Sequence, residues 1–326
     1  MSTRPKVLVL DSAIHHDAIN MLQEECEVAL FPAGASEEDV LPCCGAAVAF
    51  LVRSWNVTRR ILEASPRLRI IARHGSGVDN VDVSGATERG VVVTITGAAN
   101  STAVSEFTFA LMLGLCRLVP AADRSMKGRE WAREAFIGVE LEDKTLGIIG
   151  LGNIGTRVAR HGRGFGMHVL AYDPDLSAED IVARGAQPAS LQDVFTQADF
   201  VSLHPRLTTA TFHMIDAEAI GTMKKGVRII NTSRGPVIDE AALVKGLQTG
   251  RIAGAALDTF EEEPLSPGHP LRAFPNVLLS PHIAGQTEES LKRMATGAAR
   301  AILDELDGKT PVHIYNPEAL QNRRLD

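Results

Sequence analysis

The sequence predicts an α/β protein built from two doubly wound parallel sheets. Short apolar, β-rich runs alternate with helical periodicity along the chain, which is typical of parallel sheets. The length of 326 residues exceeds what one core ordinarily holds, which favours two domains. A glycine-rich turn also follows a predicted strand near the middle of the chain.

The predicted strands fall into two series. The first series comprises Lys6–Leu10, Glu27–Phe31, Ala46–Val52, Leu68–Ala72 and Val91–Thr94. The second comprises Thr145–Gly150, Met167–Tyr172, Ala198–Leu203, Val227–Asn231, Ile252–Asp258 and Val277–Ser280. Helical stretches such as Ile14–Glu25 and Thr58–Ala64 lie between them. Six strands with intervening helices are what a doubly wound nucleotide-binding sheet requires.

Two long helical patterns, Thr102–Leu118 and Thr287–Leu306, flank the second series. The simplest layout therefore has a nucleotide domain at residues 101–287. The chain ends, 1–100 and 288–326, would combine into a second, discontinuous domain.

Composition narrows the class of partner. The net charge of -7 and the pI near 5.8 disfavour nucleic acid and membrane surfaces, which attract basic faces. No apolar run approaches a membrane span, and Met1–Lys6 does not resemble a signal peptide, so we expect a cytoplasmic protein.

The adjacent Cys43 and Cys44 suit neither a zinc motif nor a disulfide framework, and the histidines lack metal-site spacing. We expect reduced thiols and no metal.

The turn from Gly150 to Gly155 predicts a dinucleotide site. Gly150 makes the tight turn, Gly152 lets the backbone approach a pyrophosphate, and Gly155 lets helix and strand pack closely. The phosphates would lie at the N-terminus of the helix that begins near Asn153, where the N–H groups and the helix dipole favour anions.

An acidic residue at the end of the next strand specifies the dinucleotide. Asp173 lies 18 residues after Gly155, where a ribose-binding carboxylate is expected. A carboxylate there accepts hydrogen bonds from both ribose hydroxyls and repels a 2′-phosphate, which favours NAD over NADP. The alternative is that Asp173 only starts a turn before Pro174.

Charged residues follow three later strands of the second series. Arg234 lies beyond one strand, Asp258 and Glu263 follow the next, and His282 follows the last. Taken singly, such residues are more commonly solvated or structural. Together they match hydride transfer to a ketone, which requires a proton donor, a cation beside the carbonyl and a carboxylate that keeps the donor protonated.

At this point the sequence resembles the D-isomer-specific 2-hydroxyacid dehydrogenases over nearly its whole length. The matching stretches are Val52–Ser54, His74–Asn80, Asn100–Glu106, the glycine turn, Asn231–Gly235, Asp258–Pro264 and Ser280–Gly285. The resemblance implies a Rossmann NAD-binding domain inserted into a flavodoxin-like substrate domain. It also implies an NAD-dependent enzyme that acts on a small 2-hydroxy or 2-keto acid, and a homodimer formed through Ser101–Phe136.

The resemblance implies residue roles as well. His282 would be the general acid in reduction and the base in oxidation, and Glu263 would hydrogen-bond its ring and raise its pKa. Arg234 would bind the substrate carboxylate and carbonyl, helped by backbone N–H groups around Ser76 and Gly77 of the other domain. Closure of the domains would exclude water.

The implied substrate-binding residues are Arg53, Ser76, Gly77, Arg234 and His282. The implied cofactor-binding residues are Ser76, Gly150, Gly152, Asn153, Ile154, Gly155, Asp173, Pro205, Thr232, Ser233, Arg234, Asp258, His282, Ala284 and Gly285.

Three positions depart from the family pattern. Where the family usually has the sequence His-x-Pro-Leu, this chain has His204, Pro205, Arg206 and Leu207. The proline is therefore one position earlier, and Arg206 occupies the position that the proline usually has. The backbone contact of this loop with the cofactor is therefore in doubt, and we expect Arg206 to face solvent. Asn153 replaces a frequent arginine, which leaves the pyrophosphate to backbone amides. Trp55 either narrows the substrate pocket or belongs to the core.

Two other functions fit parts of the pattern. The family includes NADH-sensing transcriptional co-repressors, although this sequence shows no basic tail or disordered partner-binding extension. Dehydrogenases of formate or phosphite use a similar scaffold, and the set of Arg234, Glu263 and His282 does not exclude phosphite.

Overall fold

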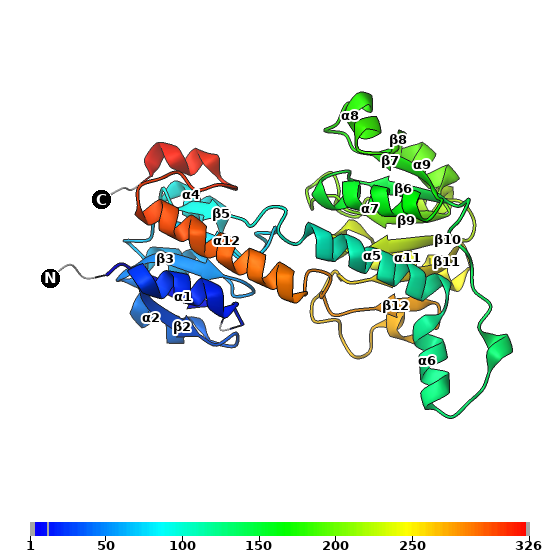
Figure 1. The fold of residues 1–326 in the computed structure, drawn as a ribbon, viewed down its shortest axis with the longest axis horizontal. Coiled ribbons are helices and arrows are strands. Elements are labelled where there is room, and N and C mark those ends of the chain that lie inside the picture. Colours follow the sequence, from blue (N-terminus) through cyan, green and yellow to red (C-terminus); the bar gives the residue numbers. More distant parts are fainter. Residues whose placement is uncertain (1–3, 12, 324–326) are drawn as a thin grey trace. The chain divides into compact units, whose positions relative to one another are not determined.

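The computed structural model describes residues 4–11 and 13–323. The chain divides into two compact units, here called unit 1 (Met1–Asn100 with Gln286–Asp326) and unit 2 (Ser101–Gly285). In Figure 1 the blue N-terminal strands and the orange helix α12 (Glu288–Leu306) belong to the same unit, so unit 1 is discontinuous in sequence.

In the described part of unit 1, five parallel strands form a sheet in the order β2-β1-β3-β4-β5. The strands are β1 Lys6–Leu10, β2 Glu27–Phe31, β3 Ala47–Val52, β4 Ile70–Arg73 and β5 Val92–Thr94. This is the flavodoxin-like order. The five predicted strands are all present, with their ends shifted by at most two residues.

Helices cover both faces of this sheet. They are α1 His16–Glu25, α2 Glu37–Cys44, α3 Arg59–Glu63, α4 Val83–Glu88, α12 and the 3-10 helix η4 Pro317–Asn322. Alternate β1 residues face opposite layers: Val7 and Val9 pack with α1 and α12, whereas Leu8 and Leu10 pack with α2 and α3. Both faces of the strands are therefore buried, as expected of a parallel sheet.

In the described part of unit 2, seven parallel strands form a sheet in the order β12-β11-β10-β9-β6-β7-β8. They are β6 Thr145–Ile149, β7 His168–Tyr172, β8 Gln187–Pro188, β9 Phe200–Leu203, β10 Val227–Asn231, β11 Ile252–Leu257 and β12 Val277–Leu279. The sequence predicted six of them. It missed β8, because two residues carry no periodicity and Pro188 confines this strand to a sheet edge.

The helices of unit 2 complete a Rossmann domain, which confirms the predicted fold class. They are α5 Ser101–Cys116, α6 Val119–Lys127, α7 Asn153–Gly164, α8 Ala178–Ala183, α9 Leu191–Gln197, α10 Ala217–Thr222 and α11 Glu240–Gln248. Three short 3-10 helices accompany them: η1 Arg133–Ala135, η2 Gly235–Val237 and η3 Pro270–Ala273.

The helix predicted over Thr102–Leu118 ends earlier than expected. Leu118 has φ 55°, in the left-handed region, and Pro120 lies at the start of α6, so the chain turns there. Among the described helices, no single one has the length and hydropathy of a membrane span. Helices α5 and α6 meet that criterion only as a pair bent by 64°, and α5 is largely buried within unit 2.

The C-terminal segment is attached to unit 1 by a buried charge. The side chain of Glu305 on α12 is fully buried. Its Oε2 lies 2.8 Å from Arg323 Nη2, and its Oε1 lies 3.6 Å from Arg69 Nε. A buried carboxylate is costly unless it is paired, so both arginines are needed to offset its desolvation.

We expect the substitution Arg323→Ala to destabilise unit 1 by about 3 kcal/mol, because it leaves the buried Glu305 with one weaker partner. Hydrogen exchange of α12 peptides in increasing urea measures this separately from unit 2. The control is Lys309→Ala, which removes an exposed ion pair with Asp307 and should change stability by less than about 1 kcal/mol. Equal stability of the two variants would contradict the proposed role of Glu305.

Candidate active site

The glycine turn between β6 and α7 is shaped by close backbone contacts. Gly150 has φ 86°, and a Cβ there would lie 2.7 Å from the carbonyl carbon of His204. A Cβ on Gly155 would lie 2.1 Å from Gly150 O, so α7 packs directly on the turn. Larger residues do not fit at either position. At Gly152 a Cβ would meet no described heavy atom within 4 Å, so this side of the turn is open.

The open side fits a dinucleotide phosphate. Gly152 is the N-cap of α7, and no described side chain caps it. The first N–H groups of this 12-residue helix, including those of Asn153 and Ile154, therefore remain for an anion. Asn153 is exposed, and the expectation that backbone amides hold the phosphates stays a prediction.

Asp173 lies at the end of β7 and is tied to this turn. Its Oδ2 accepts a hydrogen bond from Leu151 N at 2.7 Å, and its Oδ1 accepts one from Asp175 N at 3.0 Å. The bond from Asp175 N shows that Asp173 starts a turn at Pro174, as the alternative interpretation of this residue expected. Each carboxylate oxygen keeps a further lone pair, so the same side chain is able to accept bonds from a ribose.

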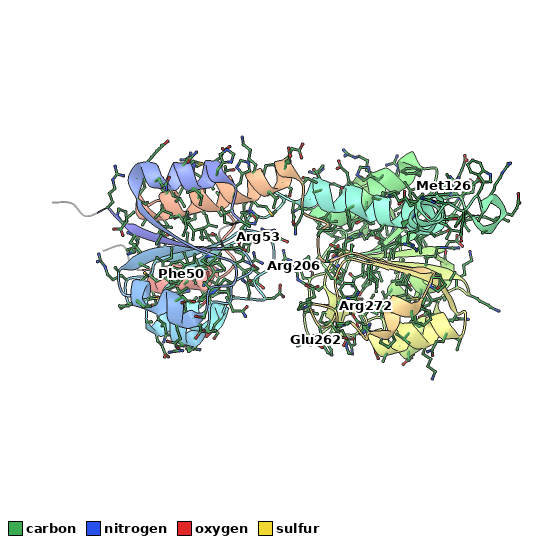
Figure 2. The ribbon with its side chains drawn as sticks, turned by 90° about the horizontal axis from the view of Figure 1, so that it is seen from below. Phe50, Arg53, Met126, Arg206, Glu262 and Arg272 are labelled. Atoms are coloured by element: carbon green, nitrogen blue, oxygen red, sulfur yellow. The ribbon has the colours of Figure 1, made fainter. Side chains whose placement is uncertain are left out.

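The loop after β9 lies beneath Gly150. A Cβ on Gly150 would lie 2.8 Å from Pro205 N, which carries no hydrogen, so this residue offers the cofactor no N–H donor. Arg206 is exposed, as predicted, and appears near the carboxyl ends of the unit 2 strands in Figure 2. The buried His204 ring bonds to Ser202 Oγ at 2.8 Å, and burial lowers its pKa to about 3, so it is neutral.

Asn231, at the end of β10, shapes the segment that carries Arg234. Its fully buried side chain accepts bonds from Ser233 N and Ser233 Oγ at 2.9 and 2.8 Å, and donates to Arg234 O at 2.9 Å. The guanidinium of the half-buried Arg234 donates to Ser233 O at 2.8 Å. The buried Thr232 bonds to Thr108 Oγ1 at 3.0 Å. The path of the backbone around Arg234 is thus fixed by side-chain bonds.

Asp258, at the end of β11, shapes the segment that carries His282. Its fully buried carboxylate accepts bonds from Ser280 Oγ at 2.6 Å, Ile283 N at 2.9 Å and Ala284 N at 2.8 Å. Its carbonyl accepts one from His282 N at 2.9 Å. Burial raises the pKa of Asp258, and these donors act against that rise. Because its carboxylate already holds the loop through three donors, contact with a cofactor would be an additional role.

Glu263 and His282 lie together at this edge of the sheet. Glu263 Oε2 lies 2.8 Å from His282 Nδ1, and Glu263 Oε1 accepts a bond from Phe260 N at 3.1 Å. The His282 side chain is 51% exposed, so a solute is able to reach its ring. Gly285 follows His282 in the same loop and is half-buried. The structure therefore joins the predicted acid–base residue to its predicted carboxylate.

The predicted residues of unit 1 lie at the carboxyl ends of β3 and β4. Arg53 follows β3 and donates to Ala13 O at 3.3 Å. Ser76 is exposed and Gly77 is half-buried in the loop after β4. Thr96 Oγ1 anchors this loop by accepting a bond from Gly75 N at 2.9 Å. The buried His74 Nε2 lies 3.3 Å from Leu291 O, and burial lowers the pKa of His74 to about 4.

Trp55 belongs to the core of unit 1. Its side chain joins the cluster that includes Leu8 and Phe50, and its indole N–H donates to Ala35 O at 2.8 Å. Only 7% of Trp55 is exposed. Of the two interpretations that the sequence left open, the core is therefore the correct one.

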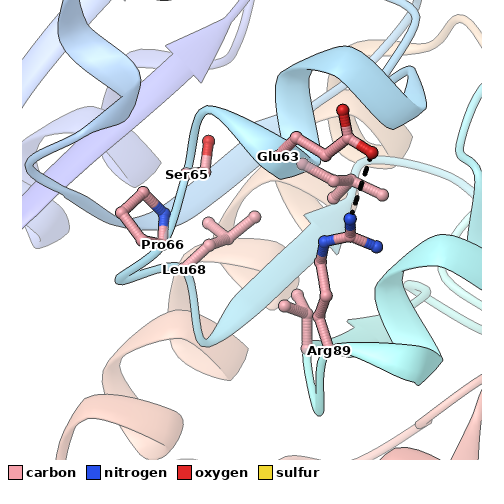
Figure 3. Close-up of a pocket in the computed structure, with 7 residues that line it drawn as sticks. Glu63, Ser65, Pro66, Leu68 and Arg89 are labelled. Atoms are coloured by element: carbon pink, nitrogen blue, oxygen red, sulfur yellow. Dashed lines mark hydrogen bonds and ion pairs between the residues drawn. The ribbon is translucent and has the colours of Figure 1, made fainter.

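Unit 1 has two other features that the sequence did not predict as sites. The pocket in Figure 3 is rimmed by an Arg89–Glu63 ion pair of 3.3 Å. Leu68 and Val91 line it just before β4 and β5, so it lies at the amino edge of the sheet. His15, His16 and Asp17 have ligand-type atoms within 4.8 Å of one another, but Lys292 Nζ lies 2.7 Å from Asp17. That carboxylate is already paired with a cation.

Sequence reasoning missed residues that organise the site. Asn231 and Ser280 were part of matching stretches, but no role was assigned to either. Glu240 and Glu261 were not recognised as partners, although they bond to each other's backbone at 2.9 Å. A buried polar residue at a strand end is the one local signal for Asn231, whereas nothing local pairs two glutamates that are 21 residues apart.

Comparisons with known proteins agree with this geometry. Residues 109–284 match the family described as D-isomer specific 2-hydroxyacid dehydrogenase, NAD binding domain. A D-3-phosphoglycerate dehydrogenase from Synechocystis sp. is 42% identical, over 94% of this chain and 55% of that protein. A glyoxylate reductase from Thermofilum pendens is 38% identical, over 99% of this chain and 98% of that protein. The structure of a glyoxylate reductase from Paecilomyes thermophila has a TM-score of 0.88 at 29% identity, and covers 98% of this chain and 99% of that one.

The chain spans little more than half of the length of the phosphoglycerate dehydrogenase from Synechocystis sp.. The family match covers the glycine turn, Asp173, Arg234 and His282. The matched family domain binds NAD, which confirms the prediction that the cofactor is NAD. The chain belongs to the D-isomer specific 2-hydroxyacid dehydrogenase family.

Proposed function

We propose that this chain is an NAD-dependent oxidoreductase that interconverts a small D-2-hydroxy acid and its 2-keto acid. The observation that carries the proposal is the 2.8 Å contact between His282 Nδ1 and Glu263 Oε2. This pair lies at the carboxyl edge of the sheet whose β6 leads into the glycine turn. The glycine turn and Asp173 would hold NAD, which would supply hydride transfer at C2 of the substrate. Residues 101–285 are the cofactor domain of this proposal, and residues 1–100 with 286–326 are its substrate domain.

His282 moves the proton in this mechanism. The carboxylate of Glu263 takes the bond from Nδ1–H, so Nε2 is the nitrogen that exchanges a proton with the substrate oxygen. In reduction the imidazolium donates the proton from Nε2, and in oxidation the neutral ring accepts it. Burial acts to raise the pKa of Glu263, but the bond from His282 and the charges of His282 and Arg234 lower it overall. An ionised Glu263 stabilises the protonated ring.

Arg234 binds the substrate's carboxylate and polarises its carbonyl in this proposal. Its carbonyl accepts a bond from Asn231 Nδ2 and its guanidinium donates to Ser233 O, so neighbouring residues hold both its backbone and its side chain. In unit 1, Arg53 and, in the loop after β4, Ser76 and Gly77 stay predicted substrate-binding residues. The anchoring of this loop by Thr96 supports that role, because a fixed loop binds with less loss of entropy.

The direct test is an NADH-oxidation screen over glyoxylate, hydroxypyruvate and larger 2-keto acids, with phosphoglycerate, formate and phosphite assayed in the oxidative direction. We expect turnover with at least one 2-keto acid. We expect His282→Gln to lower kcat by about 10² to 10⁴ while NADH still binds, because the general acid is lost and the glycine turn and Asp173 are kept.

The matched control is His168→Ala, since His168 is an exposed histidine at the amino end of β7. It should leave kcat unchanged. Full activity of His282→Gln would refute its role as the acid–base residue. Turnover of phosphite or formate alone, or NADH binding without turnover of any of these compounds, would favour the alternative functions.

Asp173 sets the preference for NAD in this proposal. We expect Asp173→Asn to raise the Kd for NADH about tenfold and to narrow the preference over NADPH, because the amide accepts fewer ribose bonds and no longer repels a 2′-phosphate. Fluorescence titration with both cofactors measures this. A wild-type protein that binds NADPH more tightly than NADH would show that the role assigned to Asp173 is wrong.

The protein also forms a homodimer in this proposal, through α6 and the loop after it. Large apolar side chains are exposed there, and such side chains are enriched at protein interfaces. They are Val119 at 55%, Met126 at 55%, Trp131 at 82% and Ile137 at 82% exposed. We expect light scattering to give twice the chain mass of 35.0 kDa. Trp131→Glu should give a monomer, whereas Val182→Glu, at an exposed residue of α8, should leave the dimer intact. A monomeric wild type would refute the dimer.

A cytoplasmic location completes the proposal. All four cysteines lie in the described part of the chain and are free. Burial raises the pKa of Cys26 and of Cys116 to about 11, which keeps both as unreactive thiols. Buried reduced thiols are typical of proteins in reducing compartments.

A further inference from the structure

Two glutamates of unit 2 bond to each other's backbone. Glu240 N, at the start of α11, donates to Glu261 Oε1 at 2.9 Å, and Glu261 N donates to Glu240 Oε1 at 2.9 Å. We call Glu240 and Glu261 the glutamate clasp. It joins the segment after β10 to the loop after β11, two segments that lie 21 residues apart in sequence.

Each carboxylate of the clasp also has a histidine partner. His269 Nε2 lies 3.0 Å from Glu240 Oε2, and His213 Nε2 lies 3.1 Å from Glu261 Oε1. Leu271 N donates to His269 Nδ1 at 3.4 Å, so the proton of a neutral His269 ring is on Nε2 and points to Glu240. The Glu240 side chain is 11% exposed, and this set of donors offsets much of the cost of burying it.

Beside the clasp the two segments are in direct backbone contact. A Cβ on Gly235 would lie 1.8 Å from the carbonyl carbon of Phe260 and 2.4 Å from Glu261 N. Gly235 follows Arg234 in sequence, and Phe260 N donates to Glu263 Oε1 at 3.1 Å. This contact therefore fixes the backbone before Glu263 against the backbone after Arg234.

From this geometry we infer that Glu240 is a positioning residue for the acid–base pair. Among the described residues, no hydrogen bond or ion pair joins it to Glu263 or His282. It acts through Glu261 and the Gly235 contact to hold Glu263 Oε2 at 2.8 Å from His282 Nδ1. When the Glu240 carboxylate is lost, Glu261 N loses its acceptor and only the bond from residue 240 N to Glu261 Oε1 remains, so the loop from Glu261 to Glu263 is free to shift. A displacement of about 1 Å in a catalytic group costs on the order of 10²-fold in rate. This inference rests on the proposed function of His282.

The first test compares Glu240→Ala with Glu240→Gln. Alanine removes both bonds that the Glu240 side chain makes, whereas glutamine keeps an oxygen that accepts from Glu261 N. We expect Glu240→Ala to lower kcat about 10- to 100-fold, to shift the pH profile of kcat/KM and to leave the Kd for NADH unchanged. Glu240→Gln should restore most of kcat. The control is Glu218→Ala, since Glu218 lies in the first turn of α10 and is exposed.

A purely structural role would give a different result. It would lower the Tm of Glu240→Ala without moving kcat or the pH profile of the folded protein, and that outcome would overturn the inference. A double-mutant cycle adds a second criterion. With Glu263→Gln already present, Glu240→Ala should cause little further loss of kcat, since Glu240 acts through Glu263. Fully additive losses would also overturn it.

A third readout does not depend on turnover, so it separates this inference from the proposed function. In protein labelled with ¹⁵N-histidine, the Nδ1 proton of His282 should give a low-field NMR signal, assigned by its loss in His282→Gln. We expect Glu240→Ala to shift or broaden this signal and Glu218→Ala to leave it unchanged. If the wild type reduces no 2-keto acid, the proposed function fails while this measurement still tests the clasp. An unchanged signal in Glu240→Ala would refute the clasp.

Discussion

The candidate site depends on the buried carboxylate of Asp258. Burial raises the pKa of this group, and Ser280 Oγ, Ile283 N and Ala284 N all donate to it, which offsets the cost of removing it from water. The same residue accepts a bond from His282 N through its carbonyl. His282 has φ 53°, a left-handed conformation that costs a non-glycine residue on the order of 1–3 kcal/mol. These bonds hold His282 in it, and the ring is thereby directed to Glu263.

Parallel strand geometry brings the other parts to the same place. Strands β10 and β11 pair in register so that Asn231 lies opposite Leu257, and Asp258 N donates to Asn231 O at 2.9 Å. The buried Asn231 is the last residue of β10, and the buried Asp258 is the first residue after β11. Asn231 bonds to the loop that follows its own strand, and Asp258 bonds to the loop that follows the neighbouring strand β12. Asn231 shapes the path to Arg234, and Asp258 shapes the path to His282. A site supported from rigid strand ends is held more precisely than one supported by loops alone.

Local sequence was sufficient wherever a feature depends on a few consecutive residues. The glycine turn and its distance to Asp173 follow from the length of one β–α–β unit, so both could be predicted. The break at Leu118 and the two-residue β8 could not, because a left-handed leucine and a short edge strand are imposed by tertiary packing. The position of Trp55 was undecided for a similar reason. An aromatic ring with one N–H donor suits a core or a pocket equally, and only the acceptor at Ala35 O distinguishes them.

The run Glu261–Glu263 shows where local reasoning ends. Three identical side chains stand in succession, yet Glu261 bonds to Glu240 N, Glu262 is exposed (Figure 2) and Glu263 bonds to His282. Intrinsic chemistry does not distinguish them, so the difference comes from the partners that each meets. The backbone contact at Gly235 leaves no room for a side chain there, which fixes the path of the loop and therefore the direction of each carboxylate. In this protein a glycine that carries no chemistry determines which of three glutamates is placed beside the histidine.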